Sequence, residues 1–199
     1  RITNSHRIFQ MTLLAVTCVL LVVSLIGGDY LEDQAGQNAP TILALLLLMF
    51  VARNGSLSDV SMLAIIAFVW LHILGARYVY SDVPYDDWAT TVWGKSITET
   101  FHFRRNHYDR VVHFAYGLLA TPPQTEFLRR RLRTSLFWTH LLSIPIVIAT
   151  GALYEIFEWG LAVLCAPDFA DHHNGQQGDM WDSQKDMALN FLGAVTAAT

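Results

Sequence analysis

Acidic residues recur at helical spacing near the end of the chain, in a stretch that leads directly into an apolar tail. Asp179, Asp182 and Asp186 stand at positions i, i+3 and i+7, so a helix would align them in one stripe with Asn190 one turn further on. Ionisable residues inside membrane helices are costly and normally face a bundle interior or a water-filled cavity. The stripe therefore predicts a site.

Two further pairs of polar residues have spacings that suit chemistry. Glu155 and Glu158 are i, i+3 within a long hydrophobic segment. Asp109 and His113 are i, i+4, which suits either shared metal ligation or a carboxylate that orients an imidazole. The pattern resembles the carboxylate layers of metal-binding helical bundles, although the Glu-x-x-His motif of di-iron proteins is absent.

Counting charges indicates what such a site would bind. Six carboxylates (Asp109, Glu155, Glu158, Asp179, Asp182 and Asp186) stand against two obvious cations, Arg77 and Arg110. Buried negative charge in excess must be met by protons, by a metal ion or by further cations. Oxygen ligands with one or two imidazoles from His72, His107 or His113 fit a divalent Zn, Mn, Fe or Mg ion better than an ion that prefers thiolates.

This reasoning assigns a role to each candidate residue. His72 and Asp109 are candidate catalytic acid/base or ligand-orienting groups, and Arg77 and Arg110 are candidates for binding an anionic substrate group. The predicted metal ligands are His113, Glu155, Glu158, Asp182 and Asp186.

Structural interpretations of the same residues stay open. Asp179 and Asp182 could simply begin a helix, where acidic residues complement the helix dipole. Arg77 and Arg110 could lock helices together through ion pairs, and His72 could be a hydrogen-bonded core residue. A structural polar network, a metal site and a metal-free substrate or proton site therefore remain three alternatives.

The composition is that of a membrane protein. Of 199 residues, 53% are hydrophobic and 15% are charged, and the mean hydropathy is +0.33; soluble domains carry about 25% charged residues. We predict an all-α integral membrane bundle, a single domain over residues 1–199 with both ends incomplete. Its six transmembrane helices are expected at 8–28, 41–52 (with an earlier start near Gly36 as an alternative), 60–76, 111–121 (stopped by Pro122-Pro123), 136–164 (kinked near Pro145) and from 180 onward.

Positive charges orient this bundle. Arg129, Arg130, Arg131 and Arg133 form the dense basic cluster, which the positive-inside rule places in the cytoplasm together with Arg7 and Arg53. Six spans then put both termini in the cytoplasm and residues 81–105 outside, where 88–103 is expected to form one interfacial helix. The candidate residues of four spans would lie at one depth, in the outer half of the bilayer.

The sequence lacks the features that are typical of several functional classes. A net charge of −4 gives no reason to expect nucleic acid as a partner. Cys18 and Cys165 lie in separate segments, so neither a disulfide framework nor a thiolate metal site is expected. GxSxG, P-loop, GxGxxG and HExxH motifs are absent. The loop cluster Asp171-His172-His173-Asn174 is a weak ligand motif by itself.

Four blocks in order resemble the YjdF-like family of bacterial inner-membrane proteins: GARYVYSDVP (75–84), NHYDRVVHF (106–114), YEIFEW (154–159) and QGDMWDSQKDM (177–187). The resemblance implies a small helical protein of the bacterial inner membrane and supports these blocks as site residues, without implying a reaction. Arg77 departs from the histidine expected at that position of the family block. The spacing of Asp186, Asn190 and Gly193 also resembles VanZ-like membrane proteins, weakly.

Three functional hypotheses follow. The first is a metal-dependent membrane enzyme that acts on a lipid or other amphiphile, with membrane lipids as its surroundings. The alternative is a non-catalytic accessory or assembly subunit of a larger membrane protein complex, in which the polar layer is structural. A proton-coupled transporter ranks lower, because paired interrupted helices are not seen in the sequence.

Overall fold

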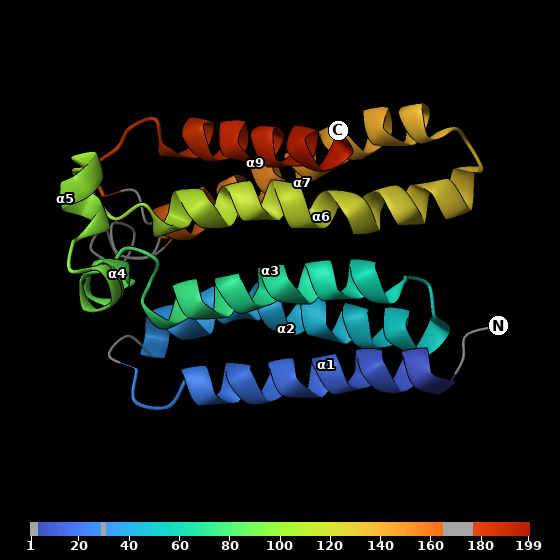
Figure 1. Cartoon of the computed structure of the whole chain (residues 1–199), viewed down its shortest axis with the longest axis horizontal. Helices are drawn as coiled ribbons and strands as arrows, with labels where there is room; N and C mark the ends of the chain where they lie inside the picture. The colour runs from blue at the N-terminus through green and yellow to red at the C-terminus, as the bar shows by residue number, and fades with distance from the viewer. Residues whose placement is uncertain (1–3, 29–30, 165–176) are drawn as a thin grey trace.

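In the part of the chain that the structure describes, six long helices form two groups that lie along the long axis of the molecule. The computed structural model describes residues 4–28, 31–164 and 177–199. One group contains α1 (Asn4–Ser24), α2 (Leu31–Asn54) and α3 (Asp59–Arg77), and the other contains α6 (Tyr108–Leu132), α7 (Leu136–Leu164) and α9 (Asp182–Ala198) (Figure 1). Contacts between α3 and α6 join the groups. Within these described ranges all regular structure is helical, as predicted.

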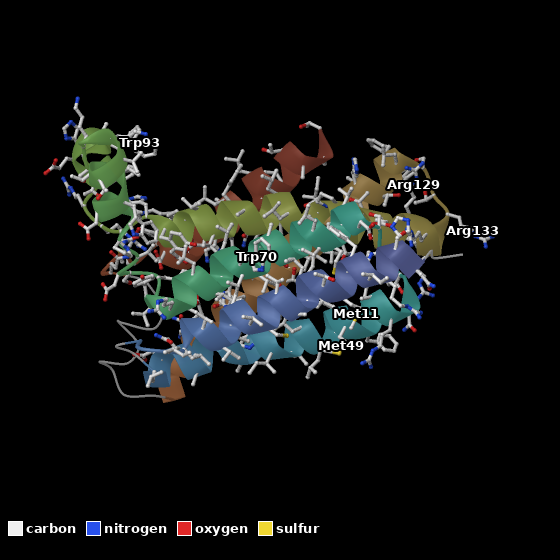
Figure 2. All side chains as sticks on the ribbon, turned by 60° about the horizontal axis from the view of Figure 1, so that its bottom comes forward. Met11, Met49, Trp70, Trp93, Arg129 and Arg133 are labelled. Carbon is white, nitrogen blue, oxygen red and sulfur yellow. The ribbon has the colours of Figure 1, made fainter. Side chains whose placement is uncertain are left out.

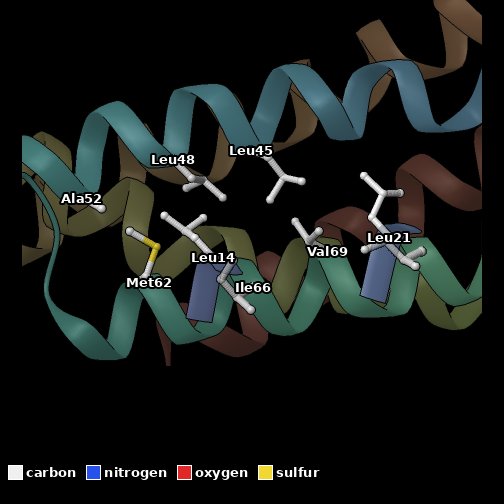
Figure 3. Close-up of a cluster of buried hydrophobic side chains, with 9 residues drawn as sticks. Leu14, Leu21, Leu45, Leu48, Ala52, Met62, Ile66 and Val69 are labelled. Atoms are coloured by element: carbon white, nitrogen blue, oxygen red, sulfur yellow. The ribbon is translucent and has the colours of Figure 1, made fainter. Parts of the chain in front are cut away.

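An apolar core holds the first group together. It lies between α1, α2 and α3, and two of its members, Met62 and Ile66, are completely buried (Figure 3). The other buried members are Leu14, Leu21, Leu45, Leu48, Ala52, Val69 and Ile73. Their spacing of three or four residues along each helix places them on one face, which packs against the neighbouring helices.

Four of the described helices are long and apolar enough to cross a membrane: α1, α2 over Asp33–Asn54, α3, and α7 over Leu136–Gly160. Their outer faces are apolar as well; Val19, Leu43 and Phe50 are all more than half exposed. Exposed apolar faces of this extent suit contact with lipid rather than water. The helices therefore support a membrane protein.

Two helices are longer than expected because they continue through proline. Pro40 lies inside α2, which extends well beyond the expected 41–52. α6 does not stop at Pro122-Pro123 but runs to Leu132, so this prediction was wrong. A proline removes one backbone hydrogen bond, which contacts beyond it can offset; Glu126 accepts hydrogen bonds from Ser58, and Thr125 donates one to Ser143. Tertiary contacts thus keep the end of α6 helical.

The expected single helix over 88–103 is two short helices at one end of the bundle, α4 (Tyr85–Trp93) and α5 (Ile97–Phe101). Gly94 ends α4 in the left-handed region with φ of 72°, and the Ser96 side chain then caps α5 by accepting a hydrogen bond from the Glu99 amide. These two local signals end one helix and start another, so the segment does not form a continuous helix. Trp93 is 72% exposed, as an interfacial anchor would be.

Basic residues gather at the other end of the molecule. Arg129 and Arg133 lie at the end of the long axis opposite to Trp93 (Figure 2). Arg7 donates a hydrogen bond to the carbonyl of Arg53 over 2.9 Å, so the start of α1 and the end of α2 meet there. This end of the bundle is therefore rich in arginine.

Candidate functional site

Asp109 and His113 occupy one buried face at the start of α6. Helix α6 begins at Tyr108, so Asp109 stands in its first turn and His113 one turn further on. Oδ1 of Asp109 lies 3.4 Å from Nε2 of His113, and both residues are less than 10% exposed. The i, i+4 spacing therefore brings the two side chains together, as expected.

Asp186 of α9 completes a group of three potential metal ligands. One ligand atom from each of Asp109, His113 and Asp186 lies within 4.8 Å of the other two, and all three residues are buried. Two carboxylates and one imidazole are ligands that Zn, Mn and Fe accept in proteins. The described part of the chain thus contains a site that could hold an ion.

Glu155 of α7 adds a carboxylate beside this group. Its Oε1 atom lies 3.5 Å from Nε2 of His113. Among the described residues this buried oxygen accepts no hydrogen bond. Because buried carboxylate oxygens are costly without a partner, the atom is available to an ion, a proton or water.

Close approach of helices brings these groups together. A Cβ atom on Gly117 of α6 would overlap the backbone of Asn190 in α9, and a Cβ atom on Gly193 of α9 would overlap the backbone of Phe114. Gly151 of α7 leaves room for the Asn190 amide. Small residues at crossing points let membrane helices pack backbone to backbone. Asp186 therefore reaches the α6 pair.

A network of ion pairs borders the three-ligand group towards the α4–α5 end. Arg110 contacts Oδ1 of Asp182 and Oδ1 of Asp186, each over 2.5 Å, and donates to the Asp182 carbonyl over 3.0 Å. Arg105 also contacts Oδ1 of Asp182, over 2.6 Å. Two guanidinium groups thus neutralise Asp182, and Arg110 holds Asp186 in place. Asp182 belongs to this network rather than to the three-ligand group.

Asp179 lies at the outer edge of the network. Its carboxylate accepts a hydrogen bond from the Lys185 ammonium over 2.5 Å and lies 3.2 Å from Arg110. The hydrogen bond from Lys185, with another from the backbone of Trp181, lowers the pKa of the Asp179 carboxyl. This residue is therefore ionised at neutral pH.

A cavity of about 190 Å³ lies beside the ligand group, between α2, α3, α6, α7 and α9. Asp109, His113 and Asn190 line it on one side, and His72 and Tyr80 contribute from the segment that contains α3. The rest of the lining includes Phe68, Val69, Val112, Tyr116, Tyr154, Pro40 and Ala44. A mostly apolar cavity with a few convergent polar groups is typical of small-molecule sites.

Six of the predicted site residues do not line this cavity: Arg77, Arg110, Glu155, Glu158, Asp182 and Asp186. Arg77 turns towards α1, where its guanidinium donates to the carbonyls of Ser24 and Ile26 over 2.6 and 3.1 Å. Glu158 is half-buried and lines a different pocket, together with Glu155 and Asp182. Residues 171–174, the weak loop cluster, lie outside the described residues.

Sequence reasoning missed a polar stripe on α2. Gln34, Gln37, Asn38 and Thr41 are all at most 3% exposed and face the interior of the bundle. Their i, i+3, i+4, i+7 spacing was a readable signal of one helix face. It was missed because the helix was predicted from the apolar run 41–52, and even the alternative start near Gly36 lies after Gln34. His72 contacts this stripe, since its Nε2 atom lies 3.0 Å from the Gln37 carbonyl oxygen.

Comparisons with known proteins agree with this description. The family model described as "Predicted membrane protein (DUF2238)" matches residues 9–199. The inner membrane protein YjdF of Escherichia coli K12 is 30% identical over 190 residues, which cover 95% of this chain and 86% of that protein. No solved structure gives a significant match. The similarity thus extends well beyond the four blocks that first suggested it.

Proposed function

The chain belongs to the predicted membrane protein family DUF2238, and we propose that it is a metal-dependent enzyme of the bacterial inner membrane that acts on a lipid or other amphiphile. The observation that carries this proposal is the buried group of Asp109, His113 and Asp186, with ligand atoms within 4.8 Å of one another. This group borders a largely apolar cavity, where the apolar part of such a substrate would bind.

The negative charges around His113 suit a bound cation. Asp109 and Glu155 both lie within 3.5 Å of its Nε2 atom, and Asp186 shares the same group. Among the residues that the structure describes, Asp186 contacts the guanidinium of Arg110, and no such contact is found for Asp109 or Glu155. A divalent ion would neutralise the remaining carboxylates in a region of low dielectric. Zn, Mn or Fe suits one imidazole among carboxylates better than Mg, which prefers oxygen ligands.

The proposed roles of the predicted residues follow from their contacts. Asp109, His113, Asp186 and Glu155 would hold the ion, which supplies a Lewis acid or an activated water when bound. Arg110 would position Asp186, and Asp182 would position Arg110. His72 remains a candidate acid/base group, whereas Arg77 would bind substrate only if it left its contacts with α1.

We extend the topology to six membrane spans in a single domain over 1–199. α6 and α9 would be the fourth and sixth spans, because they pack with each other and with α7 around the site. Both termini would be cytoplasmic with the arginine-rich end of the bundle, and α4 and α5 would lie at the outer surface. The site would then lie in the outer half of the bilayer.

One observation favours the alternative of an accessory or assembly subunit in a larger membrane complex. Ion pairs with Asp182 from Arg110 in α6, and from Arg105 in the segment before α6, already join this part of the chain to α9 without any ion. In that function the polar layer would only stabilise the bundle.

Metal analysis of the purified full chain tests the enzyme proposal at its first step. We expect about one equivalent of Zn, Mn or Fe in the wild type and loss of the ion in Asp186→Asn and Glu155→Gln. Asp179→Asn, at the outer edge of the ion-pair network, is the matched control and should keep the ion. A wild-type protein that binds none of these ions, even after they are added, would favour the structural alternative.

A further inference from the structure

The hydrogen bonds of His72 determine which of its ring nitrogens carries a proton. Nε2 lies 3.0 Å from the backbone carbonyl oxygen of Gln37, which can only accept, so Nε2 is the donor. In the neutral ring Nδ1 is then the acceptor. Nδ1 is in hydrogen-bond contact with the Tyr80 hydroxyl. Tyr80 therefore donates to His72, and the Gln37 carbonyl orients the ring.

The backbone at Tyr80 is strained, and local contacts hold it in this position. Val79 and Tyr80 follow α3 with φ angles of 44° and 56°, in the left-handed region that a β-branched residue rarely adopts. The Tyr80 amide donates to the Gly75 carbonyl over 2.8 Å, and a Cβ atom on Gly75 would overlap the Tyr80 ring. Strained residues of this kind cluster at functional sites, because other contacts must offset their cost.

Tyr80 and His72 line the same cavity as Asp109 and His113. A hydroxyl that donates to a histidine, which a third group orients, is the arrangement of an activated hydroxyl in enzymes. We propose that Tyr80 and His72 are a proton-transfer pair for a hydroxyl-bearing molecule bound in this cavity. The Tyr80 oxygen takes the proton of the bound hydroxyl as the phenolic proton passes to Nδ1 of His72, and the reverse transfer returns both protons.

A catalytic role for this pair rests on the proposed function. To that function it adds Tyr80 as a proton-transfer residue. It also specifies the substrate class: an alcohol, or a compound that releases an alcohol. A merely structural hydrogen bond between Tyr80 and α3 would not raise the reactivity of the hydroxyl. Tyr116 offers a comparison within the same molecule. It lines the same cavity, but its hydroxyl contacts Oγ1 of Thr150, which is not a base.

Methanesulfonyl fluoride is a probe small enough for this cavity and needs no known substrate. The Tyr80 oxygen would attack the sulfur atom; an S–O bond forms, the S–F bond breaks, fluoride leaves, and the phenolic proton passes to Nδ1 of His72. The full chain in detergent is treated with the probe, and peptide mass spectrometry follows labelling of each tyrosine. We expect labelling of Tyr80 well ahead of Tyr116. His72→Gln should slow labelling of Tyr80 by about 100-fold, the size of a general-base contribution.

Two results would contradict the proton-transfer pair. The first is that Tyr80 is labelled no faster than Tyr116, or that neither is labelled. The second is that the rate of Tyr80 labelling is unchanged in His72→Gln. The first comparison uses the wild type only, so it does not depend on how a variant folds. Treating the protein with a chelator separates this inference from the metal proposal. Labelling that persists without metal supports the pair even if no ion is ever bound, and metal found in Tyr80→Phe supports the ion site independently.

Discussion

At the scale of single residues, the buried charged side chains near the site stabilise one another because each contacts more than one partner or shares a partner with its neighbour. Oδ1 of Asp182 contacts both Arg105 and Arg110, and Arg110 also contacts Asp186. All four residues have side chains no more than 11% exposed. Because a buried charge that loses its partner keeps its full desolvation cost, the network is more sensitive to loss of one member than to replacement of all of them.

Truncating Asp182 should therefore destabilise the protein strongly. Asp182→Ala leaves two buried guanidinium groups without this carboxylate, and we expect a loss of about 3 kcal/mol in the free energy of unfolding. Denaturant unfolding in detergent micelles, followed by circular dichroism, measures it. Lys185→Ala is the control, because the Lys185 side chain is 53% exposed and its ion pair is screened by solvent. Equal stability of Asp182→Ala and the wild type would contradict the network.

At the scale of helices, the site depends on how closely α6 and α9 approach. The i, i+4 pair on α6 is local, but Asp186 reaches it only because Gly117 and Gly193 lack side chains at the crossing. Packing between membrane helices gains little from the hydrophobic effect, so close contact between small residues matters more than in water-soluble proteins. The geometry of the three-ligand group is therefore a property of this crossing.

Adding a methyl group at the crossing should disturb both stability and the site. Gly117→Ala and Gly193→Ala must push the helices apart, at a cost of about 1–3 kcal/mol for overpacking, and metal content should fall with the separation of Asp186 from His113. Unfolding and metal analysis on the same preparations measure the two effects. Gly160→Ala is the matched control on α7, because a Cβ atom there meets nothing within 4 Å. If Gly117→Ala and Gly193→Ala both bind metal as fully as the wild type, the three-ligand group is not the metal site.

At the scale of the whole molecule, polar groups are distributed unequally between the two ends of the bundle. The ligand group, its arginine network and the short helices α4 and α5 lie towards one end, while Arg7, Arg53 and the arginines from 129 to 133 lie at the other. Cytoplasmic loops of membrane proteins are rich in Arg and Lys. In the proposed topology, with the arginine-rich end in the cytoplasm, the end that holds the ligand group would face the periplasm.

Labelling of single cysteines in intact cells tests the orientation. In a background with Cys18 and Cys165 replaced by serine, a cysteine at Lys95 between α4 and α5 should react with a membrane-impermeant maleimide. A cysteine at Arg131 should react only after the cells are permeabilised. Both positions are exposed, so a difference in labelling reports the side of the membrane rather than burial. The reverse pattern would place the site at the cytoplasmic side.

Local patterns were enough to predict the helical class and one contact among the candidate site residues, and the resemblance of four blocks predicted the family. Apolar runs predicted the helices that are long enough to cross a membrane, and the i, i+4 spacing predicted the contact of Asp109 with His113. Both depend on neighbours within one or two turns, where the period of the helix alone decides which side chains meet. The continuation of α6 through Pro122-Pro123 was not predictable in this way, because contacts with α3 and α7 maintain it.

The sequence by itself determined which residues of this protein are ionisable, apolar or small, and hence that carboxylates and histidines must be buried in a helical bundle. Only the tertiary structure decided which of them meet. In the structure Asp109 lies with His113 and Asp186, Asp182 forms ion pairs with arginines, and Arg77 contacts α1. The physical reason is that distances between helices depend on backbone approach at a few glycines, and neither periodicity nor charge counting contains that information.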